Sequence, residues 1–194
     1  MSRLRVKLLA YRGADEACYT EGKEKFGRLL EPQHVEFVDQ QPEVLFFLSG
    51  GSERGAAACL EAGRFYLFLA CQEGNSYAAA LEVKAYCEQQ GIRSVLLDYA
   101  EHGTRGFVRH LYAVLQGLQR LQGQRLGLLG NVSDWLIASN IAPELLQKRL
   151  GIRLIQAAWE TLPDYRDQPV SEELLRTFQQ EDPTSLAETG KVCT

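Results

Sequence analysis

Short polar segments follow four of the apolar runs in this 194-residue sequence. They read YRGADE (11–16), SGGSERG (49–55), CQEGNS (71–76) and GNVSDW (130–135). Hydroxyl, amide, carboxylate and guanidinium groups in such loops can hydrogen-bond a polar ligand, and adjacent glycines let backbone amides approach an anion. The chemistry that these segments suggest is recognition of a small polar molecule.

The segment SGGSERG allows two interpretations. Gly50 and Gly51 could form a phosphate cradle, with Ser52 capping the helix that follows. The segment matches neither GxGxxG nor GxxxxGK[ST], so a tight turn followed by a helix N-cap explains it equally simply.

The first and third segments carry further candidates for ligand contact. Arg12 is a single cation after the first apolar run, where an arginine is usually solvated or paired with a carboxylate. Gln72, Asn75 and Ser76 belong to the third segment, in which Asn75 or Ser76 could instead cap the next helix. These four residues are candidate substrate-binding residues.

The fourth segment raises the question of why Ser133, Asp134 and Trp135 follow an apolar strand. Ser133 or Asp134 could cap a short helix while Trp135 packs in the core. Alternatively, Trp135 could stack on a sugar ring and Asp134 could accept hydrogen bonds from sugar hydroxyls. We include these three residues among the candidate substrate-binding residues.

Residues that perform covalent or metal chemistry show no recognisable spacing. The five cysteines form no CxxC pair and the three histidines form no HExxH motif. No Ser–His–Asp set can be assigned either. We therefore expect reduced, mostly buried thiols, and neither a catalytic residue nor a metal ligand within this chain.

Composition narrows the class of protein. The formal net charge of −4 gives no basic surface for nucleic acid, and no apolar run approaches the roughly 20 residues that span a bilayer. The first residues, MSRLRVKLLAYRG, alternate like a strand, unlike a signal peptide. The expectation is a cytoplasmic protein that binds neither nucleic acid nor a membrane.

Apolar runs alternate with amphipathic segments along the whole chain. The predicted strands are 5–11, 34–38, 44–48, 65–70, 94–99, 125–130 and 152–157. The predicted helices are 15–30, 56–63, 75–91, 104–123, 143–151 and 171–180. Continuous apolar strands that alternate with helices indicate an α/β fold, doubly wound around a mainly parallel sheet, Rossmann- or flavodoxin-like.

The Gln-rich segment 118–124 suggests a domain boundary. We expect an N-terminal α/β domain over residues 1–121 and the start of a second α/β unit over 122–194. A covered parallel sheet needs more chain than 122–194 provides, so the second unit is expected to be incomplete.

Three stretches resemble the N-terminal region of the L-fucose isomerase-like and arabinose isomerase-like family. They are YRGADEACYTEGKEKFGRLL, CQEGNSYAAALEVKAYCEQQGI leading into SVLLDY, and GQRLGLLGNVSDWLIASNIAPELLQKRLGIRLIQAAWETL. The first is similar to the family's Arg-bearing loop and long helix, and the third to the start of its second domain. The resemblance covers roughly residues 5 to 162.

The resemblance implies an aldose–ketose isomerase that uses a divalent metal, usually Mn²⁺. A metal that binds two sugar oxygens acidifies the adjacent C–H, and carboxylates move the proton. The family's metal ligands lie beyond the matched region, so the resemblance assigns no cofactor to this chain. It does imply sugar contacts from the first domain, made to a neighbouring subunit of a homo-oligomer.

The leading hypothesis is therefore the N-terminal region of a metal-dependent sugar isomerase-like protein that contributes substrate and oligomer contacts, without the catalytic half. The alternative is a self-standing α/β binding module for a sugar, a sugar phosphate or a nucleotide, with SGGSERG as its anion cradle. A third option is an assembly subunit without chemistry.

Overall fold

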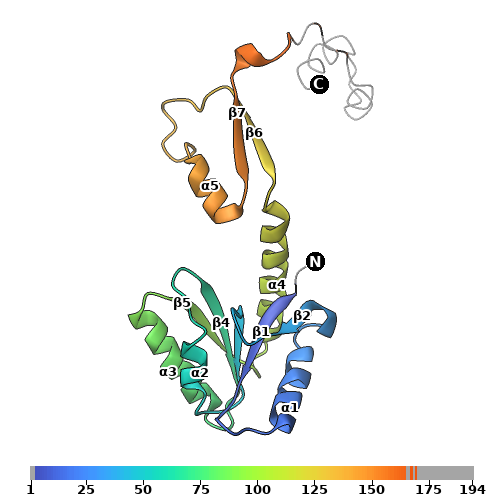
Figure 1. The fold of residues 1–194 in the computed structure, drawn as a ribbon, viewed down its shortest axis with the longest axis vertical. Coiled ribbons are helices and arrows are strands. Elements are labelled where there is room, and N and C mark those ends of the chain that lie inside the picture. The colour runs from blue at the N-terminus through green and yellow to red at the C-terminus, as the bar shows by residue number, and fades with distance from the viewer. Residues whose placement is uncertain (1–2, 165–166, 168, 170–194) are drawn as a thin grey trace. The chain divides into compact units, whose positions relative to one another are not determined.

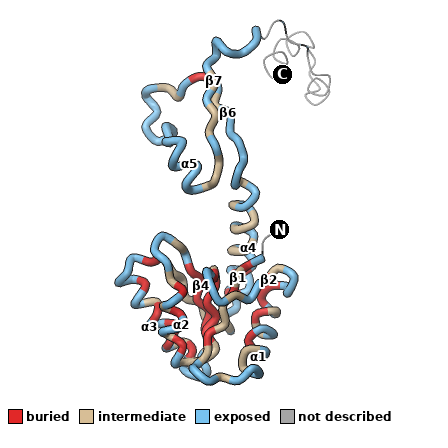
Figure 2. Tube along the Cα trace, in the orientation of Figure 1, coloured by how far each residue is buried: buried red, intermediate tan, exposed pale blue. Residues whose placement is uncertain are grey.

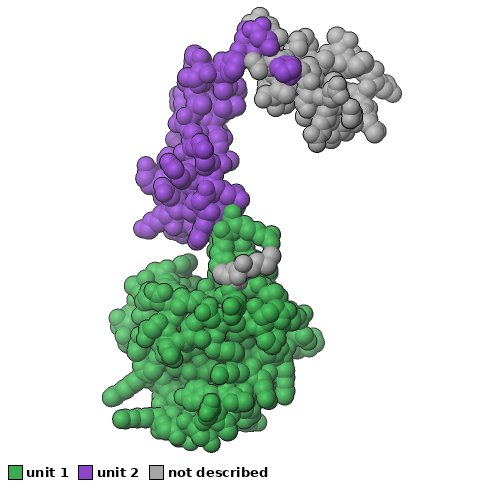
Figure 3. All heavy atoms as spheres, turned by 45° about the vertical axis from the view of Figure 1, so that its right-hand side comes forward, with its two compact units in different colours: residues 1–120 green, residues 121–194 purple. Residues whose placement is uncertain are grey.

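A computed structural model describes residues 3–164, 167 and 169. Contacts between Cα atoms divide the chain into two compact units, Met1–Arg120 and Leu121–Thr194, coloured separately in Figure 3. Each unit is described by itself. The predicted helix at 171–180 lies outside the described residues.

Unit 1 is built around a five-stranded parallel sheet in the order β2-β1-β3-β4-β5. The strands are β1 (Leu4–Leu9), β2 (Val35–Phe37), β3 (Val44–Phe47), β4 (Phe65–Ala70) and β5 (Arg93–Asp98). Strands and helices alternate along the chain, so the predicted doubly wound α/β fold with a parallel sheet is confirmed.

Helices cover both faces of this sheet (Figure 1). On one face lie α1 (Glu16–Gly27) and the first half of α4 (Thr104–Leu121), and on the other lie α2 (Glu53–Ala57) and α3 (Ser76–Gln89). The helix α1 begins where the side chain of Asp15 accepts a hydrogen bond from the backbone N–H of Cys18 at 3.0 Å. Such a cap satisfies one of the free N–H groups of the first turn.

The core is centred on β3 and β4, where successive side chains are buried on both faces (Figure 2). Phe46 is fully buried, stacks on Tyr99 with ring centroids 5.6 Å apart, and lies against Phe26 of α1. Phe47 faces the other way and packs on Phe68. Burial on both sides explains why these strands are continuous apolar runs rather than alternating ones.

Two details of the predicted helices are wrong. The helix expected at 56–63 is α2, which ends at Ala57 because the Tyr66 hydroxyl donates to the carbonyl of Cys59 and accepts from the N–H of Glu61. Those two hydrogen bonds hold residues 59–61 outside the helix. At α3, Asn75 makes no capping hydrogen bond because its backbone is left-handed, with φ 58°.

Unit 2 contains one parallel strand pair and one helix. The strands β6 (Arg125–Leu129) and β7 (Arg153–Ala157) pair in register, and α5 (Pro143–Leu150) connects them. Two 3₁₀ turns, Pro32–His34 in unit 1 and Trp159–Thr161 in unit 2, complete the described elements. Leu126 and Leu129 project from opposite faces of the pair and each is about half exposed (49% and 48%). Neither face of this pair is therefore fully covered by described residues.

A carboxyl group held between strands gives unit 1 a pH-dependent stability. Burial raises the pKa of Glu43, against the opposing effect of the Arg5 backbone N–H, which donates to its Oε2 at 2.7 Å. Because its pKa in the folded state lies above the unfolded value, the proton is bound more tightly by the folded protein. The resulting stabilisation is present at low pH and is lost as pH rises through the folded pKa.

Glu43→Gln is expected to raise the free energy of unfolding more at about pH 7 than at about pH 4. The amide oxygen of glutamine can still accept from Arg5, while the charge that burial disfavours is gone. Urea denaturation followed by circular dichroism at both pH values measures this difference. An equal effect at the two pH values would contradict the assignment.

Candidate functional site

The connections that follow the neighbouring strands β1 and β3 run to opposite faces of the sheet. β1 leads into α1 on one face of the sheet, and the neighbouring β3 leads into α2 on the other. A crevice opens at such a position outside the carboxyl ends of the strands, and ligands of open α/β sheets bind there. The strand order makes this edge the first place to look for a site.

Three loops are joined at this edge by hydrogen bonds between backbone groups and from backbone groups to serine hydroxyls. The N–H of Tyr11 donates to Oγ of Ser49 at 2.9 Å, and the N–H of Gly50 donates to the carbonyl of Gly74 at 2.8 Å. Ser76 ties two of the strands: its hydroxyl donates to the carbonyl of Phe47 at 2.6 Å and accepts from the N–H of Cys71 at 3.0 Å. These contacts fix the loops after β1, β3 and β4 against one another.

The paired glycines serve this packing. A Cβ on Gly50 would lie 3.0 Å from Cβ of Asn75, and a Cβ on Gly51 would lie 3.3 Å from Cβ of Tyr11. Gly51 also has a φ of +75°, a conformation that glycine adopts without strain. The close approach of neighbouring loops therefore requires both glycines.

The geometry does not favour the phosphate cradle considered for SGGSERG. The N–H of Gly50 is already bonded to Gly74, and the N–H of Gly51 donates to the Glu53 carboxylate at 3.3 Å. Ser52 is buried and its hydroxyl donates to the carbonyl of Ser49, so it does not cap α2. A carboxylate thus occupies the position that an anion would take.

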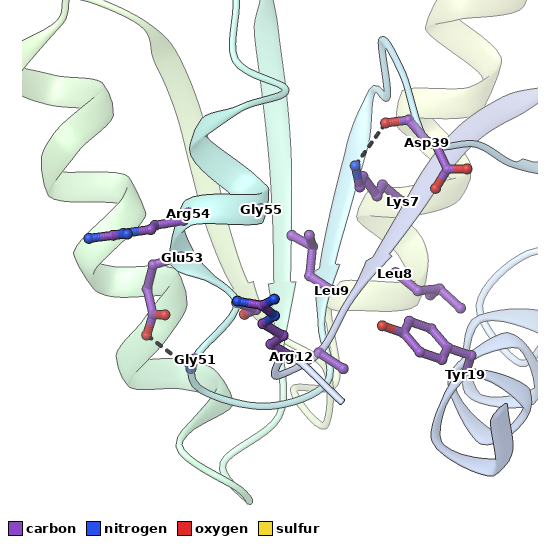
Figure 4. Close-up of a pocket in the computed structure, with 12 residues that line it drawn as sticks. Lys7, Leu8, Leu9, Arg12, Tyr19, Asp39, Gly51, Glu53, Arg54 and Gly55 are labelled. Carbon is purple, nitrogen blue, oxygen red and sulfur yellow. Dashed lines mark hydrogen bonds between the residues drawn. The ribbon is translucent and has the colours of Figure 1, made fainter. Parts of the chain in front are cut away.

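A hollow of about 790 Å³ lies beside the C-terminal half of β1, and we call it the β1 hollow (Figure 4). It exists because β2 pairs only with Leu4–Val6, which leaves Lys7–Leu9 without a strand on that side. Its lining residues are Lys7, Leu8, Leu9, Ala10, Arg12, Tyr19, Asp39, Gly51, Ser52, Glu53, Arg54 and Gly55. The hollow therefore collects residues from β1, α1, α2 and the loop after β2.

The backbone of β1 offers hydrogen-bonding groups to this hollow. The Val6 carbonyl bonds toward β2 and the Leu9 carbonyl bonds toward β3. Because these directions alternate along a strand, the N–H and C=O of Leu8 point to the side where β2 has ended. Leu8 lines the hollow, so one backbone donor and one acceptor are placed at its wall.

Charged side chains of both signs surround the same space. In Figure 4, Arg12 extends from the loop after β1 and Glu53 and Arg54 extend from the start of α2. No hydrogen bond or ion pair joins the guanidinium of Arg12 to another residue in the part of the chain that the structure describes. Among the described residues, its donors are therefore available for a ligand.

A second hollow of about 700 Å³ adjoins the first, and we call it the α3 hollow. Gly51 and Glu53 line both hollows, while Asn75 and Glu82 line only the α3 hollow. The carboxylate of Glu53 therefore stands between the two spaces.

The four substrate-binding candidates of unit 1 do not lie together in one hollow. Arg12 lines the β1 hollow and Asn75 lines the α3 hollow. Gln72 is exposed and its Nε2 donates to Oδ2 of Asp98 at 2.5 Å. Ser76 is fully buried and both roles of its hydroxyl are taken by backbone groups, which leaves it structural.

The three unit 2 candidates lie in the loop after β6. The N–H of Leu136 donates to the carbonyl of Ser133 at 3.0 Å, which makes Ser133–Leu136 a turn. Trp135 is 79% exposed, so the interpretation of this residue as core is wrong for the described structure. Asp134 is exposed as well. The loop presents polar and aromatic groups to solvent, and their role in sugar contact stays a prediction.

The sequence analysis missed Lys7, Tyr19 and Asp39, and it singled out the segment that contains Glu53 and Arg54 only as a possible phosphate cradle. Their placement depends on strand order, which no local pattern reveals. Lys7 shares the strand parity of Arg5, another cation, as well as of Leu9, so the local pattern gave no sign of its place in the hollow.

Apart from Cys59, the thiols of the described region are structural. Burial raises the pKa of Cys71 and of Cys87, and also that of Cys18, which reduces their thiolate content at neutral pH.

Within residues 3–164, 167 and 169, no three His, Cys, Asp or Glu residues cluster to hold a metal ion. The isomerase resemblance places its Mn²⁺ ligands beyond the matched residues, so it assigns none of them to this region. No helix of these residues is long and apolar enough to cross a membrane.

The fold and the hollow define a parallel α/β domain with a polar crevice at its strand-order switch point. A comparison of the sequence with models of known families and with curated proteins finds no match to either. The residues of the crevice are therefore the evidence for a function.

Proposed function

We propose that unit 1 binds a polyhydroxylated small molecule of the sugar class in the β1 hollow. The observation that carries this proposal is the combination of groups in one space: the backbone edge at Leu8 that β2 leaves uncovered, Arg12, which has no partner among the described residues, and the carboxylate of Glu53. Sugar hydroxyls both donate and accept, so a wall that mixes donors with acceptors complements them.

A neutral polyol suits the hollow better than a phosphate group. The glycine amides that would surround a phosphate are bonded within the protein, and Glu53 and Asp39 bring negative charge to the wall. Like charge at close range would disfavour an anion. One observation favours the alternative, a sugar phosphate or nucleotide: three cations, Lys7, Arg12 and Arg54, outnumber the two carboxylates.

Together with the resemblance, this supports a protein that is the N-terminal region of a metal-dependent aldose–ketose isomerase-like protein. In this proposal unit 1 supplies substrate contacts and contacts within a homo-oligomer, and the residues that hold the metal and move the proton belong elsewhere. Hydrogen bonds donated by Arg12 and accepted by Glu53 would orient the sugar, since a fixed substrate reacts faster at a neighbouring centre.

Isothermal titration calorimetry tests the choice between the two ligand classes. We expect pentoses and hexoses, or the corresponding acyclic polyols, to bind the native chain while inorganic phosphate does not compete. Binding of phosphate and of sugar phosphates, without binding of the neutral sugars, would replace the proposal by its alternative.

An activity assay tests the assignment of catalysis to residues elsewhere. With Mn²⁺ added, this chain is expected to give no aldose–ketose conversion above the protein-free control, because no described cluster of ligands holds the metal. Metal-dependent turnover by the purified chain would contradict that part of the proposal and leave the sugar-binding part standing.

A further inference from the structure

A lysine and a cysteine from distant parts of the sequence meet at the wall of the β1 hollow. Nζ of Lys7, on β1, lies 3.1 Å from Sγ of Cys59, two residues after α2. The pair lies on the face of the sheet that α2 and α3 cover, beside Leu45 and Leu9. Neither residue has a role in the sugar contacts proposed above.

Both side chains are held in position by other hydrogen bonds. Nζ of Lys7 also donates to the carbonyl of Asp39 at 2.8 Å, and Sγ of Cys59 lies 3.3 Å from the carbonyl of Gly55. The Tyr66 hydroxyl fixes the backbone of Cys59 by donating to its carbonyl at 3.1 Å. Two reactive groups fixed within about 3–3.5 Å of each other approach the geometry of a near-attack conformer.

The hollow gives a small oxidant a route toward this pair, because Lys7 lines it. Cys59 is 4% exposed, which shields it from large reagents. Lys7, Asp39 and Gly55, which lie within hydrogen-bonding distance of the thiol, all line the β1 hollow. A peroxide is little larger than water and enters a space of this size.

The other cysteines of the described region lack such a partner. No lysine Nζ lies within hydrogen-bonding distance of Cys18, Cys71 or Cys87 among the residues that the structure describes. For Cys87 the neighbouring group is Ser94, which hydrogen-bonds the buried thiol. Lys25 and Lys84 act on these thiols only electrostatically, so among the described cysteines the direct lysine contact is found at Cys59.

We propose that Lys7 and Cys59 form an oxidative modification site, in which a peroxide links Sγ to Nζ by a covalent S–N bond. Sγ first attacks one peroxide oxygen and the O–O bond breaks, which yields the sulfenic acid of Cys59 and water. The free amine of Lys7 then attacks Sγ, the S–O bond breaks, and the hydroxyl leaves with an amine proton as water. Overall, thiol, amine and hydrogen peroxide become the S–N link and two waters.

The link is reversible in the same way as a sulfenamide formed on a backbone nitrogen. A thiol reductant attacks Sγ, the amine of Lys7 leaves, and a second thiol restores the free thiol of Cys59 while the reductant becomes a disulfide. The link would tie β1 to the segment after α2 and remove the positive charge of Lys7. The proposal stands independently of which ligand the hollow binds.

Peptide mapping after peroxide treatment tests the site in the native, reduced chain. Trypsin cleaves after arginine and lysine, so a linked protein yields peptide 6–12, uncleaved after Lys7, joined to peptide 55–64, which contains Cys59 as its only cysteine. The expected mass is the sum of the two peptides less two hydrogen atoms. Fragment ions locate the bond, and dithiothreitol releases both peptides.

Three variants sharpen this test. Lys7→Arg keeps a cation beside the thiol but removes the amine, and Cys59→Ser removes the sulfur, so neither is expected to give the linked peptides. Cys87→Ser is the matched control, a buried thiol without a lysine partner, and the link should form in it as in the unsubstituted protein. Circular dichroism checks that each variant is folded.

Two results would overturn the proposal. One is oxidation of Cys59 to its sulfinic acid while trypsin still cleaves after Lys7. The other is a Cys59 that does not react with peroxide in the folded protein.

Discussion

Replacing Ser76 with alanine is expected to lower the free energy of unfolding of unit 1 by about 3 kcal/mol, since a buried group left without its partner costs about 1–3 kcal/mol. The substitution leaves two such groups, the carbonyl of Phe47 and the N–H of Cys71. Both stand at the ends of central strands, so water cannot replace the hydroxyl without opening the edge of the sheet.

Urea denaturation followed by far-ultraviolet circular dichroism measures this effect. Both tryptophans, Trp135 and Trp159, belong to unit 2, so their fluorescence follows that unit separately. Thr20→Ala on the exposed surface of α1 is the control and should change stability by less than about 0.5 kcal/mol. A change of that small size for Ser76→Ala would contradict the structural role of the hydroxyl.

Arg12→Ala is expected to weaken binding of a neutral sugar at least about tenfold. A hydrogen bond from a charged donor contributes about 1.5–3 kcal/mol, and 1.4 kcal/mol corresponds to a factor of ten in the dissociation constant. Arg12 has no partner among the described residues, so its removal should cost affinity and leave the stability of unit 1 nearly unchanged.

The matched control for Arg12 is Arg93→Ala. Arg93 is also exposed, but it begins β5 at the opposite end of the strands from the β1 hollow. Calorimetric titration of both variants with one sugar separates a local contact from a general effect of charge. Equal affinities for Arg12→Ala and the unsubstituted protein would remove Arg12 from the site.

The strands were predictable from sequence because burial on both faces requires runs of apolar residues. VLFFL and FYLFLA could hardly be anything other than covered strands, and β4 begins and ends at the predicted residues. The helix α2 was misplaced because its end depends on Tyr66, whose hydroxyl reaches back to residues 59–61. A tertiary contact of that kind is invisible in a local pattern.

The candidate site was predictable only where a residue sits in a loop after a strand. Arg12 was found in this way and lines the β1 hollow. Ser76 was selected by the same rule, yet its hydroxyl faces the interior and holds two strands together. Lys7 and Asp39 were missed because the hollow depends on β2 ending early, a consequence of strand pairing.

The structure explains part of the unusual composition of the loop after β6. Ser133 forms a turn, as a connector requires, but Trp135 is too exposed to be explained by packing among the described residues. Its contact with a sugar stays a prediction that rests on the isomerase resemblance.

Backbone amide NMR during titration with a neutral sugar tests the central claim most directly. The account predicts concentration-dependent shifts at Leu8, in the loop that contains Arg12, and at Gly51–Glu53, all of which surround the β1 hollow. The amides at the start of β5 should not move. Shifts confined to the loop after β6, or none at saturating sugar, would show that the hollow is not the binding site.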